Sequence, residues 1–296
     1  MDQVLQATKS VAMKAVIYMG WLQALFAGII QGITEFLPIS SSGHLVIYNS
    51  LFGAGDSNLV FTVFLHLATL LSVIIVFFKD IILLIREFFT AIWDILRGKP
   101  NFKTPERRLL LMVIFATIPA VLVAVLLKML KLDTLLEDIF VVAIMLIVTS
   151  VLMFFVDRLN KGKYTEADAP LKTSWLVGIL QAIAVLPGLS RSGSTIFGGL
   201  LGGYRKDFAI RFAFLLSIPA ILGAAIMELP GAMKSGSLGI GTASLVVGFA
   251  AAFICGIISI KFIRFLIKSN KFFIFSIYCL LASAFAFLVG FGVIAR

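Results

Sequence analysis

The chain has 296 residues, 60% of them hydrophobic and 14% charged, and its mean hydropathy is +1.09. This composition excludes an ordinary soluble domain and predicts an all-α polytopic membrane protein, because backbone groups in a bilayer must satisfy their own hydrogen bonds. The net charge of +10 does not indicate a nucleic-acid partner. The basic residues lie in short loops between apolar runs, where they set topology and meet anionic head groups. We expect a single membrane domain over residues 1–296.

In the first half of the chain, an apolar stretch at residues 15–33 leads into Glu35–His44, a segment that places an acid, three hydroxyls and an imidazole in apolar surroundings. Residues 59–78 carry no formal charge and predict a spanning helix, which requires about 20 apolar residues. Residues 80–97 show polar positions at three- and four-residue steps, which indicates an amphipathic helix at the membrane interface. Two further spans are expected at 109–127 and 139–156.

In the second half, residues 174–187 are apolar but too few to cross a bilayer. A helix of that length reaches about 21 Å, against a hydrocarbon core of about 30 Å. The segment therefore predicts a re-entrant helix that turns back at Pro187–Thr195, whose sequence is PGLSRSGST. Spans are expected to follow at about 211–229, 238–260 and 272–294.

An internal repeat relates the two halves. Shifted by 150 residues, positions 28–43 match positions 178–193 at seven of 16 places. The identical pairs are Gly28/Gly178, Ile29/Ile179, Gln31/Gln181, Ile33/Ile183, Ser40/Ser190, Ser42/Ser192 and Gly43/Gly193. This predicts two repeats, about 15–157 and 174–295, each with one re-entrant helical hairpin and three transmembrane helices. Three is odd, so the repeats have inverted topology, a design typical of membrane transporters.

Loop charges set the expected orientation. With this topology, 18 of the 25 Lys and Arg residues lie on one side and six on the other, while Arg191 belongs to neither. The positive-inside rule makes the first side cytoplasmic. The first hairpin then enters from outside and the second from inside, so that their tips can meet near the middle of the bilayer.

Ionisable groups at membrane depth are costly, which makes Glu35, His44 and Arg191 candidates for function. The guanidinium of Arg191 matches phosphate oxygens in charge and geometry. Hydroxyls and free helix N-termini at both tips add donors for an anion. We expect phosphate binding by the hydroxyls of these two motifs: Ser40, Ser42, Ser190, Ser192 and Thr195.

Glu35, with Gln31 one turn earlier, offers oxygen ligands to a hard divalent cation, Mg²⁺ or Ca²⁺. Ser41 is a candidate nucleophile, and His44 could activate it or protonate the leaving group. Attack by His44 itself stays open. Two structural alternatives stand beside this hypothesis. Glu35 and Arg191 could be only a structural ion pair, and each Ser/Gly-rich break only a tight helix crossing. We interpret His66, in the first span, as a packed, hydrogen-bonded residue.

At these motifs the sequence resembles the undecaprenyl-diphosphate phosphatase family of bacteria, the bacitracin-resistance type. The resemblance extends over nearly the whole chain from about Trp21. It is carried by Gln31–Glu35 running into FLPISSSGH, and by the segment Pro187–Thr195. Gln31 stands where some members have Glu, which leaves Glu35 as the only strong metal ligand of this stretch.

The resemblance implies a multi-pass enzyme of the bacterial plasma membrane that dephosphorylates a C55 polyprenyl diphosphate. The monophosphate carrier is thereby recycled for cell-wall synthesis, and bacitracin resistance follows. It also implies a divalent cation, an active site that opens to the outer face, and a catalytic set of Glu35, Ser41, His44 and Arg191. The expected partners are the lipid substrate and the bilayer, with no nucleic acid, and a homodimer stays open.

The competing function is a transporter or flippase of the polyprenyl phosphate. Inverted repeats with helices broken near the midplane are typical of carriers, so the pattern of elements alone does not separate the two classes.

Overall fold

The computed structural model describes residues 19–52, 59–99, 101–130, 138–159, 162–234, 240–266 and 271–294. Within these ranges the chain forms helices and two isolated backbone bridges, Met19–Ile240 and Tyr164–Tyr204. The helices are α2 (Trp21–Phe36), α3 (Ser41–Phe52), α4 (Leu59–Val76), α5 (Phe78–Leu96), α6 (Pro105–Met129), α7 (Ile139–Val156), α8 (Leu171–Ile183), α9 (Arg191–Leu201), α10 (Lys206–Lys234), α11 (Thr242–Leu266) and α12 (Phe273–Gly290). The prediction of an all-α polytopic membrane protein is confirmed. The predicted ends of the repeats, residues 15–18 and 295, lie outside the described residues.

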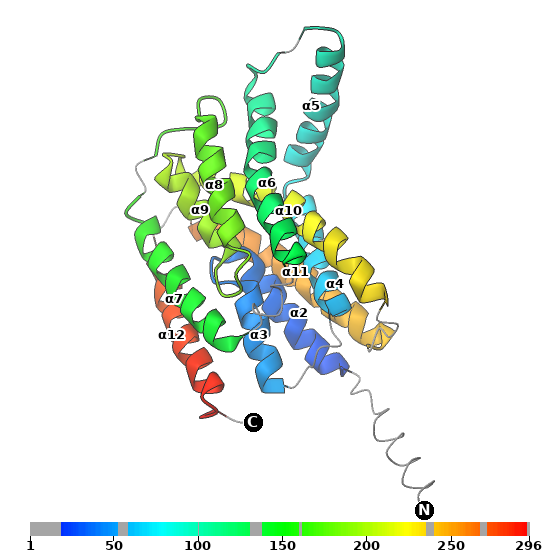
Figure 1. Cartoon of the computed structure of the whole chain (residues 1–296), viewed down its shortest axis with the longest axis vertical. Coiled ribbons are helices and arrows are strands. Elements are labelled where there is room, and N and C mark those ends of the chain that lie inside the picture. The colour runs from blue at the N-terminus through cyan, green and yellow to red at the C-terminus, as the bar shows by residue number, and fades with distance from the viewer. Residues whose placement is uncertain are drawn as a thin grey trace, which may run out of the picture.

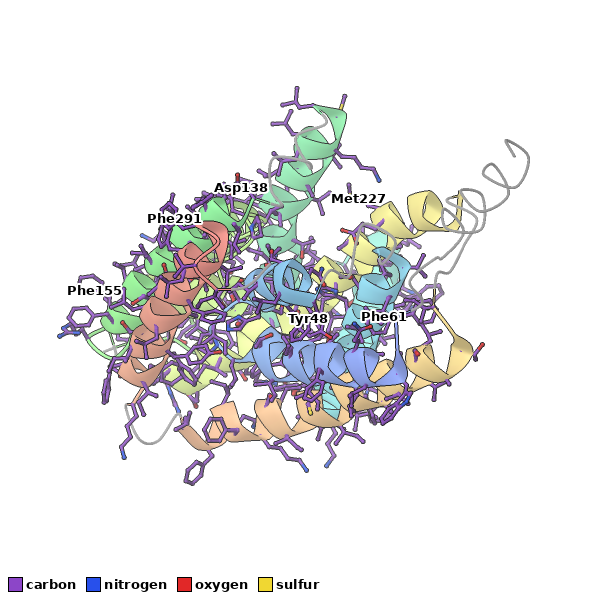
Figure 2. The ribbon with its side chains drawn as sticks, turned by 90° about the horizontal axis from the view of Figure 1, so that it is seen from below. Tyr48, Phe61, Asp138, Phe155, Met227 and Phe291 are labelled. Carbon is purple, nitrogen blue, oxygen red and sulfur yellow. The ribbon has the colours of Figure 1, made fainter. Side chains whose placement is uncertain are left out.

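Five of these helices, α6, α7, α10, α11 and α12, are long and apolar enough to cross a bilayer. A sixth candidate is the bent pair of α4 and α5, whose helices meet at an angle of 87° and pass the same test together. These positions agree with the six spans expected from the sequence. The outer surface of the bundle is rich in apolar side chains, as lipid contact requires; Phe155, at its periphery in Figure 2, is 44% exposed.

Two pairs of shorter helices form the hairpins. In α2–α3 and α8–α9 the helices have 16, 12, 13 and 11 residues, so even the longest reaches only about 24 Å. Neither pair contains a helix that can cross, and each turns back at its motif. As a result α3 begins at Ser41 and α9 at Arg191, so that both helix N-termini lie at the hairpin tips (Figure 1).

The packing of the helices follows the repeat. Helix α2 packs against α11 as α8 packs against α6, and α4 contacts α11 as α10 contacts α6. Helices α7 and α12 lie side by side, and α4 contacts α10 (Figure 1). Exchange of α2 with α8, α4 with α10, α6 with α11 and α7 with α12 maps these contacts onto one another. This is the pattern expected when a two-fold axis relates two halves of three spans each.

One pair of glycines matched by the repeat, Gly28 and Gly178, lies where two helices pack closely. A Cβ atom added to Gly28 of α2 would lie 2.3 Å from the carbonyl oxygen of Gly248, and one added to Gly178 of α8 would lie 2.5 Å from that of Ala116. Both distances are far below van der Waals contact. These positions therefore require glycine because the backbones of two helices meet there.

Helix α5 is amphipathic, as predicted, but its acidic face turns toward the protein. Arg107 of α6 donates to Glu87 at 3.1 Å and to Asp94 at 2.6 Å. Arg211 of α10 donates to Asp80 at 2.6 Å. The polar stripe thus holds buried and half-buried ion pairs, while large apolar side chains such as Phe89 and Leu96 face outward.

Candidate active site

The two hairpin tips touch each other. Ser192 of the second tip donates a hydrogen bond to the carbonyl oxygen of Leu37 in the first, at 3.2 Å. The second tip is also fixed from α7, where Thr149 donates to the Gly188 carbonyl oxygen at 2.9 Å and accepts from the Ser190 N–H at 3.0 Å. The predicted meeting of segments 150 residues apart is therefore present in the structure.

Repeat-related serines cap the two inner helices in the same way. Ser40 Oγ accepts from the Gly43 N–H at 3.3 Å, and Ser190 Oγ accepts from the Gly193 N–H at 3.1 Å. Ser40 reaches its cap position with a left-handed backbone, φ 72°, which is costly for a residue other than glycine. The caps aim the positive ends of α3 and α9 into the region where the tips meet.

Glu35 is the centre of the polar cluster, with a side chain only 2% exposed. Its Oε1 accepts from Nη2 of Arg191. Its Oε2 accepts from Ser41 Oγ at 2.6 Å and from Gln31 Nε2 at 3.0 Å. The structure thus brings together four of the predicted site residues, from both repeats, around one carboxylate.

Arg191 approaches this carboxylate as the first residue of α9. Its side chain is 21% exposed, and its other terminal nitrogen donates to the Ser217 carbonyl oxygen of α10 at 3.5 Å. A guanidinium carries five N–H donors, so the pair with Glu35 leaves donors for an anion. Because Arg191 is partly exposed and Glu35 is not, a phosphate can reach the cation without displacing the carboxylate.

All five of the predicted phosphate-binding hydroxyls form hydrogen bonds within the two tips. Ser40 and Ser190 are the caps, and each lies within 3.3 Å of the second serine of its motif, Ser42 and Ser192 respectively. Thr195 donates to the Arg191 carbonyl oxygen at 2.9 Å. Direct phosphate contact by these five residues stays a prediction. Next to them, Ser194 has a buried hydroxyl without a hydrogen-bond partner. Ser194 was not among the predicted site residues.

His44 does not join the cluster around Glu35. Its Nδ1 lies 2.7 Å from the Ser40 carbonyl oxygen, and its Nε2 lies 2.8 Å from the Tyr278 hydroxyl. The ring lines a groove of about 420 Å³ between α2, α3 and α12, whose other walls are apolar or aromatic. His44 therefore borders the site from this groove, one turn along α3 from Ser41.

His66 comes closer to Glu35 than the sequence suggested. Its Nδ1 is 2.8 Å from the Thr62 carbonyl oxygen, so the residue is hydrogen-bonded as expected. Its Nε2, however, lies 3.9 Å from Glu35 Oε2, and the side chain is 30% exposed. The sequence contained one clue to this position: a single histidine in the middle of an apolar span is energetically costly unless it has a function.

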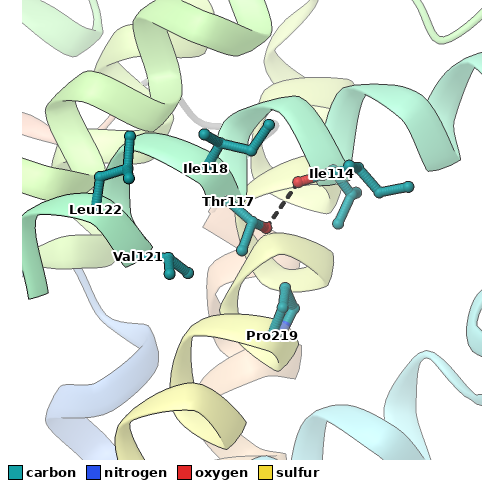
Figure 3. Close-up of a pocket in the computed structure, with 7 residues that line it drawn as sticks. Ile114, Thr117, Ile118, Val121, Leu122 and Pro219 are labelled. Atoms are coloured by element: carbon teal, nitrogen blue, oxygen red, sulfur yellow. Dashed lines mark hydrogen bonds between the residues drawn. The ribbon is translucent and has the colours of Figure 1, made fainter. Parts of the chain in front are cut away.

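A second pocket, of about 350 Å³, lies between α6 and α10 and is shown in Figure 3. It is lined by Val113, Ile114, Thr117, Ile118, Val121, Leu122 and Pro219. The Thr117 hydroxyl donates to the Val113 carbonyl oxygen of its own helix at 2.7 Å, so the pocket presents no free polar group (Figure 3). It has the character of a lipid-facing groove and offers no catalytic chemistry.

Comparison with known proteins assigns the chain to a family. Residues 24–285 match the model of the family described as bacitracin resistance protein BacA. Proteins named undecaprenyl-diphosphatase are similar over nearly their whole length. The protein of Methanobrevibacter smithii is 41% identical, with 90% of this chain and 96% of that protein aligned. For Methanosphaera stadtmanae the values are 40%, 87% and 94%, and for Parabacteroides distasonis 40%, 89% and 96%. The chain belongs to the BacA family.

Proposed function

We propose that the protein is an undecaprenyl-diphosphate phosphatase, which removes the terminal phosphate of a C55 polyprenyl diphosphate within the membrane. The observation that carries this is the joining of Ser41, Glu35 and Arg191 at the contact of two hairpin tips. A hydroxyl bound to a buried carboxylate, with a guanidinium beside it, combines a nucleophile, a proton acceptor and an anion clamp. The names of the similar proteins agree with this activity.

In the reaction, Ser41 Oγ attacks the terminal phosphorus while Glu35 Oε2, at 2.6 Å, accepts the hydroxyl proton. The bond from phosphorus to the bridging oxygen breaks, the lipid monophosphate leaves with the bridging oxygen, and a phosphoserine remains. Water then attacks that phosphorus and releases inorganic phosphate, and the serine oxygen recovers a proton. A positioned base of this kind contributes about 100-fold to 10,000-fold.

Arg191 and the two helix N-termini supply the electrostatic part. Charge builds up on the equatorial oxygens of the transferred phosphoryl group, and donors fixed in advance around it lower the barrier. The capped starts of α3 and α9 aim backbone N–H groups at the same region. The Glu35 pair keeps Arg191 in place before substrate arrives.

The donor set at Gln31 and Glu35 fits a divalent cation that is shared with the substrate. Gln31 Oε1 is buried without a hydrogen-bond partner, which leaves one free oxygen ligand beside the carboxylate. The charge of Glu35 is already balanced by Arg191, so most ligands would come from the diphosphate and water. A cation held in this way would offset the negative charge of the diphosphate.

The apolar groove beside His44 gives the isoprenoid tail a place next to the phosphate site. It runs along α3 and α12, which keeps the tail within the bilayer while the head group reaches Ser41. With the first hairpin entering from outside, as the loop charges predict, the active site opens to the outer face of the plasma membrane.

Phosphate release by protein purified in detergent tests the proposal. A flippase moves its lipid across a membrane without hydrolysing it. In detergent, where there is no membrane to cross, a flippase would release no phosphate. We expect release of one phosphate per polyprenyl diphosphate in the presence of Mg²⁺ or Ca²⁺, and 32P trapped on Ser41 after a denaturing quench at neutral pH, which preserves both phosphoserine and phosphohistidine. Label on histidine alone would refute the serine mechanism.

A further inference from the structure

Tyr278 of α12 holds the imidazole of His44 from across the groove. Its hydroxyl oxygen lies 2.8 Å from His44 Nε2, and the two rings are stacked, with centroids 5.5 Å apart and 8° between their planes. On its other side, His44 Nδ1 lies 2.7 Å from the Ser40 carbonyl oxygen. Both ring nitrogens of His44 therefore have a partner, one from each repeat.

The chemistry of these partners fixes where the protons are. A carbonyl oxygen only accepts, so His44 Nδ1 carries the proton and donates to Ser40. A neutral imidazole carries a single ring proton, so Nε2 has a free lone pair and accepts from the Tyr278 hydroxyl. The position of the Ser40 carbonyl is in turn set by the left-handed backbone of that residue, φ 72°.

We propose that Tyr278 is a positioning residue for the phosphatase reaction, which holds His44 in the Nδ1-protonated tautomer with Nε2 presented as a proton acceptor. The inference rests on the proposed function in that His44 acts on the substrate. An acceptor nitrogen can take a proton from water or attack phosphorus, but it cannot protonate a leaving group. With Ser41 as the nucleophile, the role that this arrangement leaves to His44 is that of a base, which takes a proton from the water that attacks the phosphoserine.

The surroundings of Tyr278 argue against a role in packing alone. The residue is 42% exposed on the outside of α12, so burial of its ring contributes little. Its hydroxyl reaches into a groove with apolar walls, where a hydroxyl without a hydrogen-bond partner is costly. Among the described residues the hydroxyl has one hydrogen-bond partner, His44.

Nitrogen-15 NMR of histidine-labelled protein tests the proposal directly, because the chain has only two histidines. Signals lost in His44→Gln identify the ring. We expect wild-type His44 to show a protonated Nδ1 and a hydrogen-bonded, unprotonated Nε2. In Tyr278→Phe the Nε2 signal should move downfield as the bond is lost. In the control Tyr48→Phe it should stay, since Tyr48 lines the same groove but donates to the Gln23 carbonyl oxygen at 3.0 Å.

Kinetics of Tyr278 variants separate positioning from packing. Tyr278→Phe should lower kcat about 10-fold with KM within about twofold, and Tyr164→Phe, in the segment before α8 and outside the groove, should behave as wild type. Tyr278→Leu should be no worse than Tyr278→Phe, because both lose the hydroxyl. A proton on Nε2 in the wild type, or a defect confined to Tyr278→Leu, would overturn the proposal. Absence of phosphate release by the wild type would instead contradict the proposed function, and leaves the NMR result to decide the proton positions.

Discussion

At the scale of single residues, Arg191 pairs with buried Glu35 and, in the proposed reaction, also binds phosphate. A lysine at this place would keep the charge but lose the planar fork of donors. We expect Arg191→Lys to reduce kcat/KM by about 100-fold, because the ammonium cannot serve Glu35 and a phosphate together. Arg205→Lys is the matched control, since Arg205 forms an exposed pair with Asp207. Near-normal turnover of Arg191→Lys in a phosphate-release assay would argue against phosphate binding there.

Substitution of Glu35 distinguishes its role as a base from its role in the ion pair with Arg191. Glu35→Gln keeps the size of the side chain but removes the proton acceptor for Ser41 and the charge opposite Arg191. We expect a loss of about 100-fold to 10,000-fold in kcat. Because breaking a buried pair also leaves Arg191 without its partner, unfolding in detergent should occur at a lower temperature. A variant that is destabilised yet fully active would show that Glu35 is structural only.

The residues of this cluster that belong to the two motifs could be identified from the sequence, because acids, hydroxyls and an arginine stand out in apolar runs. It could not show where side chains on the same turn would point. Ser41 and His44 are three residues apart, yet Ser41 faces Glu35 and His44 faces Tyr278. Tyr278 and His66 lie in ordinary spans, so only the packing of α12 and α4 reveals them.

At the scale of helices, the close contact of α2 with α11 depends on Gly28. In Gly28→Ala the new Cβ would meet backbone of Gly248, which cannot turn away as a side chain can. We expect a loss of about 1–3 kcal/mol in stability and lower activity, since α2 carries Glu35. Gly223→Ala is the control, because nothing lies within 4 Å of a Cβ built on that glycine of α10. Equal melting temperatures of the two variants would contradict the assigned helix contact.

Structural constraints at a few positions explain why the repeat is detectable from so few identical residues. One matched pair of glycines, Gly28 and Gly178, lies at backbone crossings, and one matched pair of serines, Ser40 and Ser190, caps helices. Geometry allows few alternatives at such positions. In contrast, helix α5 has no counterpart among the described residues of the second half. Its polar pattern was visible in the sequence, but the direction of its acidic face depended on Arg107 and Arg211, far along the chain.

At the scale of the whole molecule, inverted topology requires the hairpins to enter from opposite sides. Asn49 near the end of α3 and Arg205 just after α9 are exposed. The expected topology places Asn49 on the outer side and Arg205 on the cytoplasmic side. In a background with Cys255 and Cys279 replaced, we expect Asn49→Cys to react with an impermeant maleimide on intact cells. Arg205→Cys should react only after permeabilisation. Labelling of both from one side would contradict the inverted repeat.

In the proposed mechanism, a serine of one hairpin and an arginine of the other act together on the diphosphate. The most direct measurement is phosphate release from undecaprenyl diphosphate by purified wild type, Ser41→Ala, Arg191→Ala and the control Arg205→Ala. We expect turnover by the wild type and the control, and almost none by Ser41→Ala or Arg191→Ala. Turnover by Ser41→Ala close to that of the wild type would contradict this mechanism.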